Sequence, residues 1–199
     1  MTAPLPSPRT GRAAVAAGVL LFASVAAELL RPVQTADGFL TDVAGFVVYL
    51  AAWTLGAGCL VVALSGLRDA TSSRAGRVGR WISLAGAALF TAFGVVALGT
   101  AVLAGEPAEW SFLLFAVGLL LLVVGAVPLA LGLRHGLPGW WIAVLVAGVG
   151  AAVALLVEPD PGHDLGLFVF DAAWVALGLG LLSRSPQIAA ASRPERSSV

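Results

Sequence analysis

The sequence predicts an all-α integral membrane protein with six transmembrane helices arranged as three consecutive hairpins. The first observation is composition: the 199 residues are 59% hydrophobic and only 11% charged. The second is a set of six apolar segments, separated by short polar turns. The third is that arginines cluster in alternate turns. A soluble domain of this size cannot hide so much apolar surface, whereas a helix bundle in lipid can expose it.

The apolar segments set the expected helices and their pairing. In order, we expect helices at 13–30, 43–67, 81–105, 110–133, 140–157 and 165–182. Most of these runs are long enough to cross a hydrocarbon core of about 30 Å. They form a transmembrane domain over 13–184, with hairpins at about 13–68, 80–134 and 139–184. The polar, Pro-containing ends, 1–12 and 185–199, are both expected to be disordered cytoplasmic tails.

The first apolar segment has two interpretations. Its uncharged part, Ala13–Ala27, is short for a span, and its end, Ser-Val-Ala-Ala, resembles a signal-peptidase site. We expect a retained, tilted first helix because further spans follow at once. A cleaved signal peptide that leaves five spans is the alternative.

The positions of the arginines predict the orientation. All basic residues are Arg, and only Arg31 lies on the side that carries most acids. The other ten are Arg9, Arg12, Arg68, Arg74, Arg77, Arg80, Arg134, Arg184, Arg193 and Arg196. Because Arg-rich turns stay in the cytoplasm, we expect a plasma-membrane protein with both termini inside.

A common pattern connects the hairpins. Each returning helix ends at an arginine: Arg68, Arg134 or Arg184. The first and third returning helices carry Asp, Phe and Trp in the same order and at similar spacing. These residues are Asp42, Phe46 and Trp53 in the first helix, and Asp164, Phe168 and Trp174 in the third, where the Phe–Trp spacing is one residue shorter. A repeated two-helix unit explains this pattern. Convergence of apolar sequences is the alternative.

The last hairpin also resembles a known family. Trp141 opens a Gly/Ala-rich helix, a Pro marks the turn, and the next helix carries Trp174, Gly178 and Gly180. This arrangement is similar to the short repeat of the HdeD-type membrane proteins. The resemblance implies a six-helix protein built from such hairpins and associated with bacterial acid resistance, with no catalytic residues to carry over. The first hairpin departs from the pattern, because its outer loop is longer and its entry lacks Trp.

Glycines on the fourth helix predict close helix packing. Gly118, Gly125 and Gly132 recur every seven residues and therefore share one face. Small residues let helices approach closely in lipid.

The main candidate for function is Asp171, the only acid deep inside a predicted span. Such residues often mark proton or ion sites. Tyr49 lies at a similar depth in the second helix, and acids flank the same end: Glu28, Asp42, Glu158, Asp160 and Asp164. We expect a proton or cation site here, with Asp171 changing protonation as the outside acidifies. One alternative is that Asp171 has only a structural role. The other is that the remaining acids simply mark outer loops, which the positive-inside rule does not constrain.

Little else points to chemistry. Cys59 is the single cysteine, and His163, between Asp160 and Asp164, lacks a second His or Cys to complete a metal site. We expect His163 in a solvated loop. No Ser–His pairing or phosphate-binding loop is present in the sequence. We therefore expect no metal, no cofactor and no enzymatic activity. The expected partners are the lipid bilayer and a second copy or another membrane protein, not nucleic acid.

Three hypotheses for function remain open at the level of sequence. The favoured one is a non-enzymatic membrane protein in envelope or acid stress that acts through assembly or partners. The second is a transporter or channel that uses Asp171 and the outer acids. The third and weakest is a subunit of a membrane-embedded enzyme. Few polar residues line the predicted spans, which favours the first.

Overall fold

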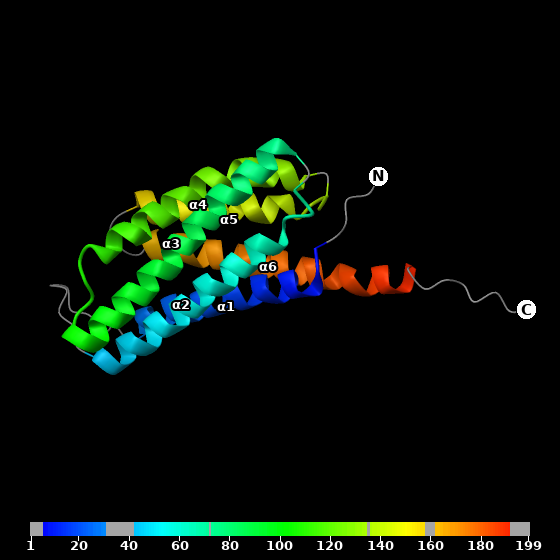
Figure 1. Cartoon of the computed structure of the whole chain (residues 1–199). Helices are drawn as coiled ribbons and strands as arrows, with labels where there is room; N and C mark the ends of the chain where they lie inside the picture. The colour runs from blue at the N-terminus through cyan, green and yellow to red at the C-terminus, as the bar shows by residue number, and fades with distance from the viewer. Residues whose placement is uncertain (1–5, 31–41, 72, 135, 158–161, 192–199) are drawn as a thin grey trace, which may run out of the picture.

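The computed structural model describes residues 6–30, 42–71, 73–134, 136–157 and 162–191. Within these ranges the chain forms six α-helices and no strand (Figure 1). The helices are α1 (Pro8–Leu30), α2 (Val43–Gly66), α3 (Arg74–Ala104), α4 (Ser111–Leu133), α5 (Trp141–Leu156) and α6 (Gly162–Ala191). Five are long and apolar enough to cross a membrane, and α5 is a shorter apolar helix of 16 residues. The predicted all-α membrane fold is confirmed.

The six helices form a closed ring. Among the described helices, each packs against its neighbours in the chain, and α1 also packs against α6. Successive helices run in opposite directions, so α1 begins and α6 ends at the same end of the bundle (Figure 1). We call that end the basic end. The opposite end, where α1 ends and α6 begins, is called the acidic end. This alternation suits three hairpins in sequence, while the homology between them stays a prediction.

Three helices extend beyond the predicted limits. α1 begins at Pro8, inside the predicted tail, and α6 continues to Ala191. α3 begins at Arg74, in the predicted basic loop, because Ser73 caps it by accepting a hydrogen bond from the Gly76 N–H at 3.0 Å. Hydropathy marks where a helix is apolar, whereas caps and helix-forming residues such as Arg decide where it ends.

Large apolar side chains face outward around the whole ring. On α2, Val48, Leu55 and Val62 recur every seven residues and are more than half exposed. The exposed large hydrophobic side chains are distributed over all six helices. A belt of this kind is unstable in water but suits lipid acyl chains. The chain is therefore a membrane-embedded protein.

Glycines bring α3 and α4 into backbone contact. On α4, Gly118, Gly125 and Gly132 form a glycine stripe, and a methyl group on any of them would collide with α3. The facing pairs are Gly118 with Gly86, Gly125 with Ser83, and Gly132 with Gly76. The predicted role of the glycine stripe in close packing is confirmed.

The contact between α1 and α6 closes the ring. Gly18 of α1 lies against the Asp171 carbonyl and Val175 of α6, and a methyl group there would collide with both. Just under one turn earlier in α1, Val15 packs against Gly178. α1 thus fills a structural position between α2 and α6, while its retention in the mature protein stays a prediction.

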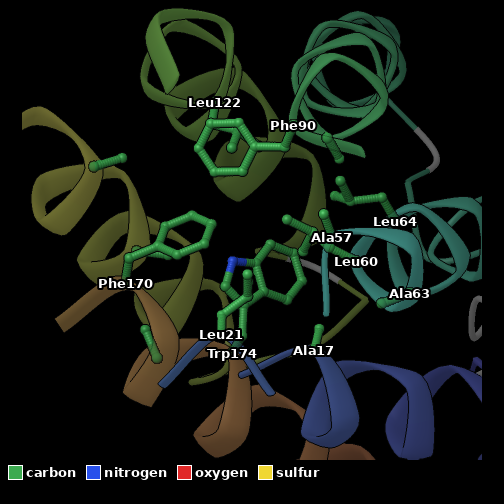
Figure 2. Close-up of a cluster of buried hydrophobic side chains, with 14 of the residues drawn as sticks. Ala17, Leu21, Ala57, Leu60, Ala63, Leu64, Phe90, Leu122, Phe170 and Trp174 are labelled. Atoms are coloured by element: carbon green, nitrogen blue, oxygen red, sulfur yellow. The ribbon is translucent and has the colours of Figure 1, made fainter. Parts of the chain in front are cut away.

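Side chains fill the middle of the ring. Figure 2 shows part of this core, with residues from five helices: Ala17, Leu21, Ala57, Leu60, Ala63, Leu64, Phe90, Leu122, Phe170 and Trp174. Nearer the acidic end, Trp53 lies 5.4 Å from Phe90 and 5.7 Å from Phe115 between ring centroids. Phe90 and Phe115 stack at 5.2 Å. Aromatic rings from α2, α3 and α4 therefore meet across the interior.

Candidate functional site

Tyr49 lies at the centre of a group of acidic side chains near the acidic end. Its hydroxyl is within hydrogen-bonding reach of the Glu28 carboxylate, and Asp164 and Asp171 are close enough to act on it electrostatically. We call Glu28, Tyr49, Asp164 and Asp171 the Tyr49 cluster. Tyr49 also packs between Phe46 and Trp53, with ring centroids 6.0 Å and 6.3 Å away. This aromatic packing fixes the direction of the phenol.

Three helices contribute to the Tyr49 cluster because α1, α2 and α6 are neighbours in the ring. Glu28 lies in the last turn of α1, and Asp164 lies in the first turn of α6. Tyr49 is the seventh residue of α2, so it lies about two turns inside the acidic end. The sequence placed Tyr49 and Asp171 at similar depth, and the structure brings them into one cluster.

Asp171 is the buried member of the cluster. It lies two turns deeper along α6 than Asp164 and is only 1% exposed. Its Oδ2 atom has no hydrogen-bond partner among the described residues. Burying an unpaired charge is costly. Gly18 lets α1 approach the backbone at this residue, so the α1–α6 contact contributes to the burial of Asp171.

Asp42 has a structural role. It is the N-cap of α2, and its Oδ1 accepts a hydrogen bond from the Gly45 N–H at 3.0 Å. A carboxylate at this position satisfies a free helix N–H and interacts favourably with the helix dipole. The remaining predicted acids, Glu158 and Asp160, lie outside the described residues.

His163 differs from the sequence prediction of a solvated loop. It lies in the first turn of α6 and is half-buried. Its Nδ1 is 2.6 Å from the Ala154 carbonyl oxygen of α5, and its ring is 5.9 Å from that of Phe115 on α4. Because a carbonyl can only accept, Nδ1 carries the proton and donates it. His163 thus connects three helices.

The described residues contain no group of three His, Cys, Asp or Glu side chains placed to hold a metal ion together. Cys59 is a half-buried free thiol that packs against the core.

One buried charge was not predicted from the sequence. Arg80, assigned to the basic loop, lies in α3 and is only 6% exposed, with no described partner for its Nε. Its guanidinium carbon lies 4.9 Å from the centre of the Trp81 ring. The spacing of Arg80, Ser83, Ala87 and Phe90 is that of one helix face. That periodicity, followed back into the loop, would have placed Arg80 toward the interior.

No protein-family model, curated protein or solved structure matches this chain. The resemblance to the HdeD-type proteins therefore stays a prediction from residue spacing.

Proposed function

We propose that this chain is a non-enzymatic, multi-pass protein of the bacterial plasma membrane whose Tyr49 cluster binds a proton when the outside is acidified. Both termini lie in the cytoplasm, so the acidic end faces outward. Proton binding changes how α1, α2 and α6 pack, and the protein acts in acid or envelope stress through assembly or a membrane partner. The observation that carries the proposal is the buried Asp171 with an unpartnered oxygen beside Tyr49.

The charges around Asp171 support a proton as the ligand. Glu28 of α1 and Asp164 of α6 are acidic, and Tyr49 of α2 is a neutral hydrogen-bonding group. His163 is the nearest basic side chain along α6, in the first turn. α5 contributes no charged side chain along its length. A proton on Asp171 removes an unpaired buried charge and adds a donor, and both effects change the packing of α6 against its neighbours.

The packed interior favours proton binding over an open conduction path. Aromatic rings from α2, α3 and α4 fill the space inside the ring next to the cluster. A proton-linked transporter is the second candidate, because buried carboxyls also serve as proton carriers in transporters. Such a transporter must open the ring during its cycle.

Infrared difference spectra of the purified protein in nanodiscs, recorded between alkaline and acidic pH, test the proposal. We expect a band from a protonated carboxyl that is present in wild type and absent in Asp171→Asn. Glu109→Gln is the matched control, because Glu109 is an exposed acid at the same end. A spectrum unchanged by Asp171→Asn would refute proton binding at Asp171.

Two further measurements separate the candidates. Proton flux in liposomes that is lost in Asp171→Asn would favour the transporter. The second measurement is the survival of acid by cells that express each protein. If Asp171→Asn equals wild type both in this survival and in flux, Asp171 is a structural residue only.

A topology experiment tests the orientation. A reporter fused after Arg74 is expected to read cytoplasmic, and one fused after Glu106 to read external, because ten of the eleven basic residues lie on one side. Both reporters on the same side would contradict the topology.

A further inference from the structure

A small cavity lies inside the ring, toward the middle of α6. Its volume is about 10 Å³, which is enough for roughly one water molecule. Four helices line it, through Ser83 of α3, Leu122, Ala126 and Leu129 of α4, Val144, Ala147 and Gly148 of α5, and Phe170 and Trp174 of α6. Most of this lining is apolar, so its two polar side chains decide what it can hold.

Those polar side chains are Trp174 and Ser83. Trp174 is 3% exposed, and no described protein group accepts a hydrogen bond from its indole N–H. Figure 2 shows the Trp174 indole reaching from α6 into the middle of the bundle. Ser83 is 2% exposed, and its hydroxyl can both donate and accept. A buried N–H without an acceptor is energetically costly.

We propose that this cavity is a binding site for a single structural water molecule. The water accepts a hydrogen bond from the Trp174 indole N–H and exchanges a second one with the Ser83 hydroxyl. Buried waters in proteins commonly satisfy polar groups in this way. The bridge joins α3 to α6, two helices with no direct backbone contact in the described ring. This inference does not depend on the proposed proton binding.

Trp53 provides an internal comparison. It is 2% exposed, and its indole N–H also has no described acceptor. However, Trp53 does not line the cavity, and the rings of Phe90, Phe93 and Phe115 surround it at 5.4 to 6.3 Å. The surroundings of this indole are therefore aromatic rings, whose faces are weak acceptors. Two buried indoles of one chain should differ in their contact with water.

The test is solution NMR of the full-length protein in nanodiscs with ¹⁵N-labelled tryptophan. The chain has six Trp residues, so the indole N–H signals are few. Trp174→Phe and Trp53→Phe assign the two buried signals by their loss. We expect a magnetisation-transfer peak between water and the Trp174 N–H, and none for Trp53. The Trp174 signal should also lie downfield of the Trp53 signal, because it is hydrogen-bonded.

Two substitutions locate the water. Ala147→Val fills the cavity and should abolish the water peak of Trp174 while leaving the indole in place. Ser83→Ala removes one of the two polar partners and should shift the Trp174 signal upfield. A Trp174 signal without a water peak in wild type would overturn the proposal. A water peak that persists in Ala147→Val would overturn it as well, because the water would then lie elsewhere.

Discussion

The ring of Phe115 on α4 lies 5.9 Å from the imidazole of His163 on α6, across the interior of the helix ring. The backbones of these two helices do not meet in the described structure. His163 also donates a hydrogen bond to the Ala154 carbonyl at 2.6 Å, in the last turn of α5. One side chain therefore holds together the acidic end of three helices.

Substitution of His163 should destabilise that end. We expect His163→Ala to lower the free energy of unfolding by about 1–3 kcal/mol, because it leaves the Ala154 carbonyl unpaired and removes a ring contact. His163→Phe keeps the ring and should lose less. Thermal unfolding of both variants in one detergent provides the measurement. Equal stability of His163→Ala and wild type would show that the contact contributes nothing.

The packing of α3 against α4 should depend on glycine at one position and not at another. A methyl group at Gly79 would lie 2.8 Å from the Pro128 carbonyl carbon, whereas Gly99 of the same helix has no atom within 4 Å of such a group. We expect Gly79→Ala to destabilise by about 1–3 kcal/mol through overpacking. Gly99→Ala is the matched control and should stabilise by about 0.5–1 kcal/mol. Thermal unfolding separates the two, and a stabilising Gly79→Ala would contradict the close approach.

Tyr49 and Glu28 should be energetically coupled. Tyr49→Phe keeps the aromatic packing and removes the donor to the Glu28 carboxylate, so we expect a loss of about 1.5–3 kcal/mol at neutral pH. Glu28→Gln should weaken the same contact. The double variant should lose less than the sum of the two single losses, by about 0.5–3 kcal/mol. Additive losses in a double-mutant cycle would show that the two side chains do not interact.

α1 should be present in the mature protein and should contact α6. The rings of Phe22 and Phe168 lie 4.7 Å apart between centroids. In a Cys59→Ala background, Phe22→Cys with Phe168→Cys should cross-link on oxidation, and an N-terminal tag should remain on the product. The pair Phe22→Cys with Val95→Cys, on α1 and α3, is the control and should not cross-link, because these helices are not neighbours. Loss of the N-terminal tag in membranes would support the cleaved signal peptide.

The membrane class and the helix count could be predicted because they depend on local composition. Each apolar run is long enough to identify without knowledge of its neighbours, and a seven-residue glycine repeat shows which face of α4 must pack closely. Helix ends were predicted less well, since the first turns of α1 and α3 are polar and extend past the apolar run.

The site could be predicted only in part. Asp171 stood out because no other acid lies so deep in an apolar run, and Tyr49 followed from its depth. Which helices are neighbours in the ring is a long-range property, and that property puts Glu28 beside Tyr49 and His163 beside Phe115. The cap role of Asp42 was not predicted, because it depends on the position of Asp42 at the start of α2 and not on its side of the membrane.

Closure of the ring by the first and last helices constrains how the protein is made. Of these six helices α1 is synthesised first, yet the partner for the face that carries Gly18 is α6, the last of the six. Until then, that glycine face is covered only by lipid or by an assisting protein. Asp171 becomes buried against α1 in the same late step. A ribosome that stops before α6 therefore leaves five inserted helices in an open arc, with a small-residue surface that quality-control proteases or a second chain can recognise.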